Sequence, residues 1–206
     1  MMFKAVDMDK YPRKAHFDYF NSMVYPYVGV TVNVDITSWM KKIREEGYPF
    51  FLSFLYEVVN SANSVTQFRQ RIKDNGIIEF DKCSASFTVG LEDESYAYCA
   101  VDCDMPFDEY LSYAKKREES ARLAPSIEEG EDAASHFFIS CVPWLSYTAI
   151  VQPIPTLADS NPRITWGKYF YDGDRLMIPV TVLCHHALVD GIHIAKFYER
   201  LGERVR

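Results

Sequence analysis

Two adjacent histidines stand close to an Asp-Gly pair in the stretch CHHALVDGIH, residues 184–193. A neutral imidazole titrates near physiological pH, so one of these histidines could remove the proton from a substrate hydroxyl. The carboxylate of Asp190 could then hold the loop in place rather than carry the proton. The spacing alone does not decide between a catalytic loop and a polar junction joining a strand to a helix, because short motifs recur by chance.

Each residue of the stretch also has a purely structural interpretation. Asp190 is well placed to be the N-cap of a C-terminal helix, with its carboxylate accepting a backbone N–H of the first turn. Gly191 would ease the entry turn, and a histidine beside a buried strand is often a satisfied structural group. The stretch nevertheless follows an apolar strand and precedes a helix, and strand ends that feed loops are common places for sites.

Periodicity predicts the elements that must position these residues. Alternating valines in YVGVTVNVDIT, residues 27–37, predict a strand with one buried face. Pro179 cannot donate to a sheet ladder, which predicts that its strand is an edge there or carries a bulge. The Asp172-Gly173 pair predicts a tight turn between apolar runs. Further strands are expected in 76–82, 84–91, 96–102, 137–144 and 164–184, and helices in 37–46, 50–63, 106–123 and 190–205.

Composition limits what such a chain can be. Its 206 residues, 48% of them hydrophobic, suffice for one sizeable core, and no apolar run approaches the length of a membrane span. The net charge of −7 argues against a nucleic-acid partner. The 5 cysteines are scattered without a Cys-x-x-Cys pair, so neither a disulfide framework nor a metal site is expected, and a reducing cytoplasm fits them. We therefore predict one α+β domain over residues 1–206, built as a two-layer sandwich of helices on a mixed, mostly antiparallel sheet.

The stretch CHHALVDGIH resembles the His-His-x-x-x-Asp-Gly signature of chloramphenicol acetyltransferases, dihydrolipoyl acyltransferase domains and peptide-synthetase condensation domains. Four further segments resemble the chloramphenicol acetyltransferase family in particular, in order and at similar spacing. They are YPRKAHFDYF (11–20), FRQRIKDNGIIEFDKCSASFTV (68–89), ISCVPW (139–144) and ITWGKY (164–169). Condensation domains are about twice as long as this chain, which is beyond the ordinary size of a single core.

This resemblance implies direct acetyl transfer from acetyl-CoA to a hydroxyl of chloramphenicol or a similar small acceptor. In the family the second histidine is the general base, which here is His186. The resemblance further implies that Asp190 pairs with Arg13 to order the site, and that Thr165 helps to orient the transition state through a water. No acyl-enzyme forms, so Cys184 is expected to pack rather than attack. Acetyl-CoA is a co-substrate, and neither a bound cofactor nor a metal is implied.

One position departs from the family pattern. Drug-acetylating members carry a serine five residues after the Pro-Trp tryptophan, and its hydroxyl donates to the oxyanion. Counting from Trp144 gives Ala149, with Thr148 beside it. Losing one such donor typically lowers the rate by about 10²–10³. Thr148 or Ser146 could replace the hydroxyl, or the protein is a poorer or differently tuned catalyst.

The resemblance also concerns the acceptor pocket and the assembly. Tyr25, Tyr27 and Tyr98 lie in segments that match pocket-forming stretches, and Ala149 is expected beside the substrate. The family is a homotrimer in which the base faces a neighbour's pocket, so the same assembly is expected here. Three alternatives stay open: a related acyltransferase for another alcohol, an amine or a longer acyl donor; a non-catalytic binding protein; and a lipoyl-dependent transferase core.

Overall fold

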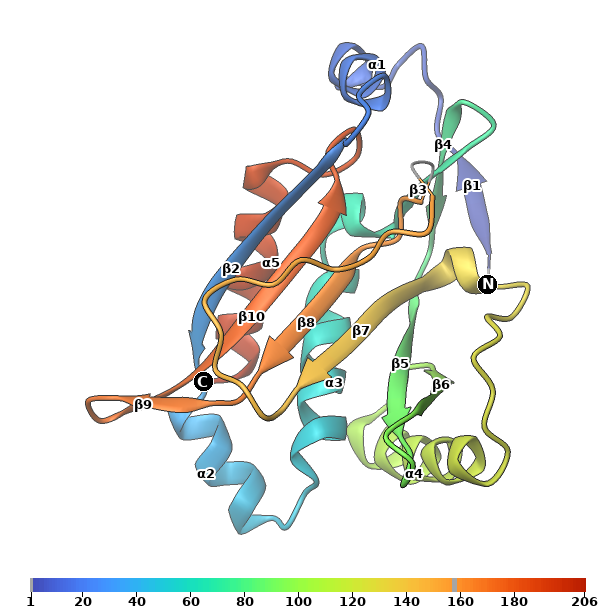
Figure 1. The fold of residues 1–206 in the computed structure, drawn as a ribbon. Helices are drawn as coiled ribbons and strands as arrows, with labels where there is room; N and C mark the ends of the chain where they lie inside the picture. The colour runs from blue at the N-terminus through green and yellow to red at the C-terminus, as the bar shows by residue number, and fades with distance from the viewer. Residues whose placement is uncertain (1, 157–158) are drawn as a thin grey trace.

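The computed structural model describes residues 2–156 and 159–206, which form two packed layers (Figure 1). The larger sheet has the strand order β2-β10-β8-β7-β5-β6, with β9 paired to β10, and a smaller sheet has the order β1-β4-β3. The pairs β5–β7 and β7–β8 are parallel, and the other pairs of both sheets are antiparallel. The predicted α+β architecture is therefore confirmed.

The bounds of the elements follow the sequence periods closely. The strands are β1 (Phe3–Ala5), β2 (Tyr27–Asp35), β3 (Gln70–Lys73), β4 (Gly76–Phe80), β5 (Ser84–Gly90), β6 (Tyr96–Val101), β7 (His136–Val142), β8 (Arg163–Gly167), β9 (Phe170–Asp172) and β10 (Arg175–His185). The helices are α1 (Lys14–Asn21), α2 (Thr37–Glu45), α3 (Phe50–Asn63), α4 (Phe107–Leu123) and α5 (Gly191–Arg204), with short 3₁₀ turns η1 (Thr66–Arg69) and η2 (Ala133–Ser135). The elements α1, β1 and β3 are additional to the predicted set.

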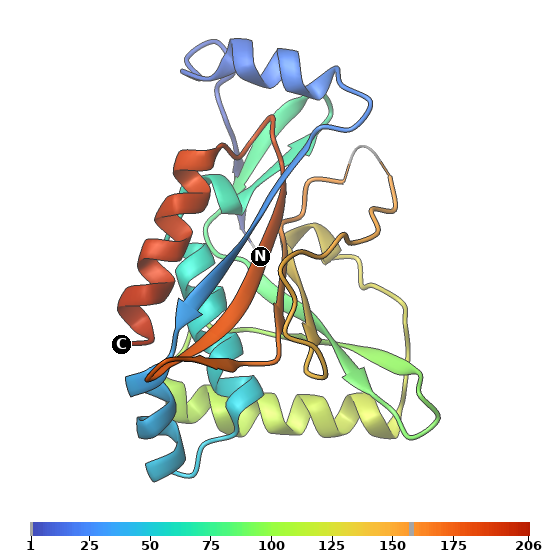
Figure 2. The ribbon, with the colours of Figure 1, turned by 60° about the vertical axis from the view of Figure 1, so that its left-hand side comes forward.

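Helices α3 and α5 cover one face of the larger sheet, and the segment between β7 and β8 crosses the opposite face (Figures 1 and 2). The core lies between the helices and the sheet. Phe54 of α3 meets Trp166 of β8 edge-on there, and both side chains are fully buried, as is the neighbouring core residue Val58. Burying a large apolar side chain contributes about 1.5–3 kcal/mol. This core therefore holds β8, which carries Thr165, and β10, which ends at His185 just before His186.

Pro179 has a strand partner on one side only, as predicted for a position at a local edge. Strand β10 pairs with β2 continuously from Met177 to His185. On its other side β10 pairs with β9 as far as Met177 and with β8 only from Val180. Pro179 falls between those two ladders, where β10 has no strand partner on that side to receive an N–H. The proline is tolerated because the chain loops out between β8 and β9.

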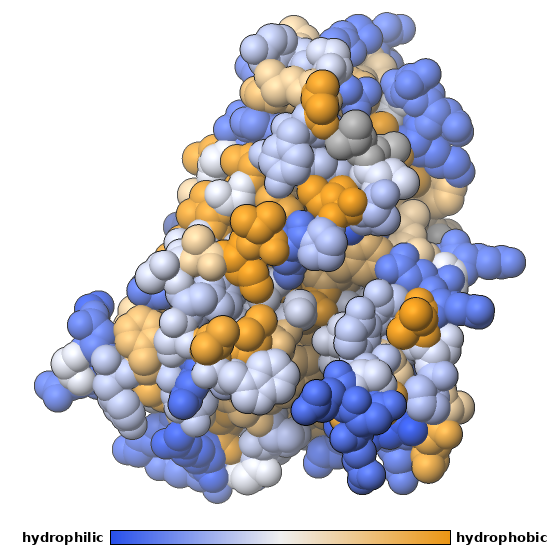
Figure 3. Space-filling view, in the orientation of Figure 1, coloured by the Kyte–Doolittle hydropathy of each residue, from blue (hydrophilic) through white to orange (hydrophobic). Residues whose placement is uncertain are grey.

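Strand β2 is the edge of the larger sheet, and its alternating valines are only partly covered. Val34 is buried, whereas Val30 is 42% exposed. The valine side of β2, which the sequence predicts to be buried, is therefore only partly covered in a single chain. Figure 3 shows apolar side chains gathered over the middle of the face seen in Figure 1. Within the described residues, no helix combines the length and apolar character that crossing a membrane requires.

Gly167 joins the end of β8 to the segment after Trp144. The backbone N–H of Lys168 donates to the Leu145 carbonyl at 2.8 Å, and the Ser146 hydroxyl donates to the Lys168 carbonyl at 2.8 Å. A Cβ atom at position 167 would lie only 2.6 Å from the Leu145 carbonyl oxygen. Glycine is needed there because the two backbones approach too closely for any side chain.

We predict that Gly167→Ala destabilises the protein by about 1–3 kcal/mol, because the added methyl forces the two backbones apart. Urea unfolding measures the loss. Gly202→Ala is the matched control, since a Cβ at position 202 of α5 meets nothing within 4 Å and alanine favours the helix. Equal stabilities of the wild type and Gly167→Ala would contradict this packing argument.

Candidate active site

His186 lies in the turn that follows β10, and three contacts hold it. Its backbone N–H donates to the Pro26 carbonyl at 2.7 Å, which fixes the turn against the start of β2. Its imidazole Nδ1 lies 2.9 Å from the Val189 carbonyl oxygen. The ring of Phe20, from the last turn of α1, stacks on the imidazole with centroids 3.9 Å apart and planes inclined by 24°. The imidazole is thus fixed both by a hydrogen bond and by a ring contact.

The bond to Val189 selects one tautomer of His186. A carbonyl oxygen can only accept, so Nδ1 must carry the hydrogen. In the neutral ring Nε2 then keeps its lone pair, which is the arrangement a general base needs. The local turn of the chain therefore presents Nε2 as the atom able to take a proton.

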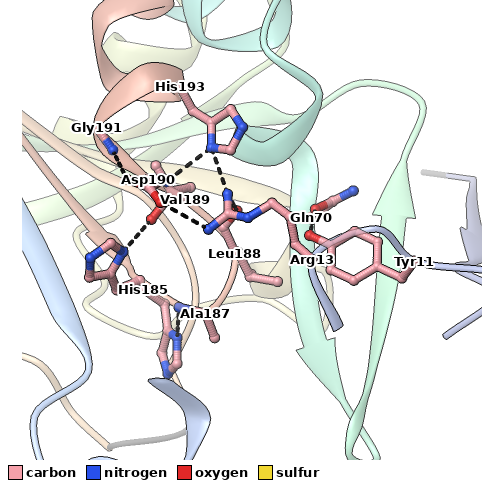
Figure 4. Close-up of polar contacts among 11 residues, drawn as sticks. Tyr11, Arg13, Gln70, His185, Ala187, Leu188, Val189, Asp190, Gly191 and His193 are labelled. Atoms are coloured by element: carbon pink, nitrogen blue, oxygen red, sulfur yellow. Dashed lines mark hydrogen bonds and ion pairs between the residues drawn. The ribbon is translucent and has the colours of Figure 1, made fainter. Parts of the chain in front are cut away.

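Arg13 connects the N-terminal segment to the entrance of α5 (Figure 4). One of its guanidinium nitrogens, Nη1, donates to the Leu188 carbonyl at 3.3 Å and lies 2.9 Å from Nδ1 of His193. The other, Nη2, is 3.5 Å from the carboxylate of Asp190. The expected Arg13–Asp190 pair is present, but the shortest of these contacts is the one to His193.

Asp190 is the N-cap of α5, as its position predicts. Its carboxylate accepts the Gly191 N–H at 2.6 Å, and the backbone N–H of Asp190 donates to Nδ1 of His193 at 3.0 Å. These contacts form a reciprocal capping box in which histidine replaces the usual glutamate or glutamine. The structural and site-ordering interpretations of Asp190 are compatible, because one carboxylate serves both.

Burial and charge set the protonation of this cluster. The Gly191 N–H and then the Arg13 guanidinium lower the pKa of Asp190, despite the opposing effect of burial. Burial, followed by the nearby Arg13, lowers the pKa of His193 to about 4. His193 is therefore a neutral acceptor at physiological pH, consistent with a structural role.

The neighbouring His185 and Cys184 are buried. Nδ1 of His185 accepts the Ala187 N–H at 3.3 Å, and the ring of Tyr27 meets the imidazole edge-on with centroids 5.3 Å apart. Burial raises the pKa of the Cys184 thiol, which disfavours the thiolate. These surroundings give His185 a structural role, and they agree with the expectation that Cys184 packs.

Thr165 lies buried in the middle of β8, between Ser140 of β7 and Thr181 of β10. Its hydroxyl oxygen accepts a hydrogen bond from the side-chain amide of Gln152. Its carbonyl accepts the phenolic hydroxyl of Tyr147 at 2.9 Å. The expected site threonine is thus coupled directly to the segment that crosses the sheet face.

The residues considered for the missing oxyanion hydroxyl lie in that same segment. Thr148 and Ala149 are exposed in the single chain. Ser146 is exposed as well, and its hydroxyl hydrogen is engaged by the Lys168 carbonyl. The geometry therefore gives no support to Ser146 as the replacement donor.

Two cavities share a wall formed by Val151, Gln152, Ile154 and Pro155. One of about 460 Å³ is lined by Tyr98, and one of about 300 Å³ is lined by Tyr25 and Tyr27. Gln152 lines both of them. The three expected pocket tyrosines are therefore divided between adjacent cavities, with Gln152 on their common wall.

The lining of the larger of these two cavities includes charged side chains. Arg163 and Glu129 contribute to its lining. Arg163 is paired with Asp159 at 2.6 Å, and both side chains are almost fully buried. Burial and then the nearby Asp159 raise the pKa of Glu129. The cavity wall thus contains the Arg163 guanidinium, whose charge is balanced by Asp159, and the separate carboxyl group of Glu129.

A third cavity of about 870 Å³ adjoins the first. Trp144, Lys168 and Tyr169 are among its lining residues, and it shares Thr88 and Ser140 with the 460 Å³ cavity. His186 is not among the residues that line these three cavities. In the part of the chain that the structure describes, no group of three or more His, Cys, Asp or Glu side chains could hold a metal ion.

The sequence interpretation omitted two residues that the structure brings to the site: Phe20 stacks on His186, and Gln152 reaches Thr165. His193, which the sequence interpretation took as structural, accepts from Arg13 and completes the capping box. Its position three residues after Asp190 is where a capping box places its second member. Gln152 had no such signal, since it lies in a segment without regular periodicity.

Comparisons with known proteins place this chain in a family and agree with its fold. The profile of the chloramphenicol acetyltransferase family matches residues 1–202. Chloramphenicol acetyltransferase 3 of Escherichia coli is 29% identical over 210 residues, covering 98% of this chain and 97% of the relative. The Proteus mirabilis chloramphenicol acetyltransferase is 26% identical over 205 residues, covering 97% of this chain and 93% of the relative.

Solved structures show the same fold. A chloramphenicol acetyltransferase superposes with a TM-score of 0.88 at 23% identity, and each chain is covered completely. The truncated catalytic core of a 2-oxoacid dehydrogenase multienzyme complex from Thermoplasma acidophilum gives a TM-score of 0.69 at 18% identity, with 98% of this chain and 97% of that chain covered.

The family profile and the curated relatives identify the chain as an acyltransferase. Within that class, the chain belongs to the chloramphenicol acetyltransferase family.

The capping histidine predicts a pH-dependent stability. The pKa of His193 is about 4 in the folded protein and near 6.5 in an unfolded chain, so the unfolded state binds more protons between these values. The free energy of unfolding should therefore fall as pH drops from about 6.5 to 4. His193→Gln keeps a usual capping-box residue without the titration, so its urea-unfolding curves should lose stability less steeply. Identical pH dependence in both proteins would contradict this assignment.

Proposed function

We propose that the protein catalyses acetyl-CoA-dependent O-acetylation of chloramphenicol or a similar small acceptor, with His186 as the general base. The observation that carries this proposal is the Nδ1 contact to the Val189 carbonyl, which leaves Nε2 free to accept a proton. Family membership supports the acyl chemistry.

The transfer needs only one deprotonation and no covalent enzyme intermediate. Nε2 of His186 takes the proton of the acceptor hydroxyl while the hydroxyl oxygen forms a bond to the thioester carbonyl carbon. The carbonyl electrons move onto oxygen to form a tetrahedral oxyanion. When this collapses, the carbon–sulfur bond breaks, and the imidazolium returns its proton to the departing CoA sulfur. Arg13 and Asp190 act by holding the turn that carries the base, without contacting the reacting atoms.

The two largest of these cavities suit the two substrates. The 870 Å³ cavity is large enough for part of a cofactor-sized molecule, and it offers Tyr169 for stacking and Lys168 for a phosphate. The 460 Å³ cavity would take the acceptor. Because they share Thr88 and Ser140, the thioester and the hydroxyl would meet beside the β5–β7 pair, next to Thr165.

A second candidate function follows from the polar wall of the acceptor cavity. Glu129 and the Arg163–Asp159 pair would favour an acceptor that carries hydrogen-bonding or charged groups beside its hydroxyl or amine. The same base and fold would then acetylate that acceptor, with little activity toward chloramphenicol. A comparison of kcat/KM for chloramphenicol and for small amino alcohols distinguishes the two candidates.

We also propose that the protein works as a homotrimer with its sites between subunits. Two observations support this assembly: His186 does not line the three cavities, and Val30 on the edge strand β2 is 42% exposed. If His186 of one subunit serves the cavities of the next, it need not line the cavities of its own chain. The exposed Val30 would then lie in the contact between subunits.

We predict a particle of three times the 23.8 kDa chain mass in sedimentation equilibrium. Val30→Glu places a charge on the valine face of β2, so it should shift the mass toward that of one chain and reduce turnover with it. Lys41→Glu, an exposed charge change on α2, is the control and should stay trimeric. A fully active wild-type monomer would contradict the proposed assembly.

We predict that His186→Ala lowers chloramphenicol-dependent CoA release by at least about 10²-fold, because the general base is lost. A thiol reagent follows the release from acetyl-CoA. His16→Ala, an exposed histidine change on α1, is the matched control and should keep wild-type turnover.

The remaining outcomes separate the alternatives. Release that depends on an amino alcohol but not on chloramphenicol, and that is lost in His186→Ala, supports the second candidate. Near-normal turnover in a folded His186→Ala protein contradicts the assignment of the base. A folded wild type that binds acceptors and releases no CoA with any of them would be a binding protein.

A further inference from the structure

We infer that the side-chain amide of Gln152 donates a hydrogen bond to the oxyanion of the tetrahedral intermediate, in place of the hydroxyl that position 149 lacks. This inference rests on the proposed acetyl transfer. It makes Gln152 a catalytic residue, because its N–H would touch the carbonyl oxygen of the transferred acetyl group.

The position of Gln152 is the first support. The residue is partly buried, and it lies on the wall shared by the cavity of Tyr98 and the cavity of Tyr25 and Tyr27. Its side chain points to the Thr165 hydroxyl, which accepts from the amide nitrogen. Thr165 in turn lies beside Ser140, one of the two residues common to the acceptor cavity and the larger cavity. The amide is therefore held close to where the two substrates would meet.

The hydrogen-bonding capacity of the amide is the second support. A carboxamide nitrogen carries two hydrogens, and the bond to Thr165 uses only one of them. The second remains available for an oxygen that becomes negative. Glutamine side chains are among the donors that stabilise oxyanions, and a donor held in advance costs no reorganisation during the reaction. The Thr165 bond supplies that preorganisation, since it fixes the amide before the charge develops.

The rival hydroxyls are less well placed. Ser146 gives its hydrogen to the Lys168 carbonyl at 2.8 Å, and Thr148 is exposed. By accepting from Gln152, Thr165 keeps its own hydroxyl hydrogen free for a second contact with a water or the intermediate. Gln152 and Thr165 would thus form one connected pair of donors beside the place where the substrates would meet.

The Gln152 amide would act when the tetrahedral intermediate forms. As the acceptor oxygen bonds to the thioester carbon, the carbonyl π electrons move onto oxygen, and the acceptor proton moves to His186. The N–H of Gln152 shares its hydrogen with that oxygen without giving it up. When the electrons return and expel the CoA sulfur, this contact weakens again. The Gln152 hydrogen bond should therefore raise kcat and have little effect on substrate binding in the ground state.

Gln152→Met and Gln152→Glu test the inference. Both keep the approximate length of the side chain and remove the N–H donors, and the glutamate can still accept from the Thr165 hydroxyl. We expect kcat to fall by about 10²–10³-fold in both variants, with each KM within a few-fold of the wild type. The pH dependence attributable to His186 should not move. Circular dichroism melting establishes that each variant is folded.

Restoration of the serine gives the sharper comparison. If Gln152 replaces the missing hydroxyl, Ala149→Ser should recover at least tenfold of kcat in the Gln152→Met background and change the wild type much less. The two positions are then non-additive, as alternative donors to one oxygen must be. A merely structural glutamine would lower melting temperature and alter KM without this recovery.

Three results would overturn the inference. One is a kcat within threefold of the wild type in folded Gln152→Met. Another is an equal effect of Ala149→Ser in both backgrounds. The third is a wild type that transfers acetyl to no acceptor, which overturns the proposed function as well. An active wild type with an unaffected glutamine variant overturns the inference alone.

Discussion

The arginine contact between the two ends of the chain is the interaction on which the site depends. Arg13, just before α1, reaches the Leu188 carbonyl, the His193 imidazole and the Asp190 carboxylate at the start of α5. These contacts fix α1 against the turn after β10, and α1 carries the Phe20 ring that stacks on His186. The Arg13 side chain is largely covered, and removing it would take a donor from the Leu188 carbonyl and from the buried His193 imidazole, so the cost would exceed that of a surface ion pair.

The same turn determines what the histidine can do. The chain from His186 to Val189 folds back so that the imidazole Nδ1 meets a backbone carbonyl, which fixes both the tautomer and the ring orientation. A second histidine, His193, is kept neutral by burial and by Arg13, and it serves the helix cap. Two histidines seven residues apart thus have different chemistry, because one faces a carbonyl and the other faces N–H donors and a cation.

Much of this architecture could be predicted from periodic residue patterns. Helix α3 matches its predicted range, and the Asp172-Gly173 pair forms the expected turn between β9 and β10. Other features depend on contacts between segments that are distant in the sequence, so local patterns could not predict them in full. Pro179 is unpaired on one side because the β8 and β9 ladders end on either side of it, and Val30 is exposed because β2 is the edge strand of the larger sheet. Gln152 carries no local signal, since its importance comes from a bond to a distant strand.

The tautomer of His186 is the most direct test of the account. In ¹⁵N-histidine-labelled wild-type protein above the imidazole pKa, the ring nitrogen shifts report which nitrogen carries the hydrogen, and His186→Ala identifies the resonances. The account predicts a neutral His186 with hydrogen on Nδ1 and a free lone pair on Nε2. A neutral ring with its hydrogen on Nε2 would contradict it, because that ring could neither donate to the Val189 carbonyl nor accept the acceptor's proton at Nε2.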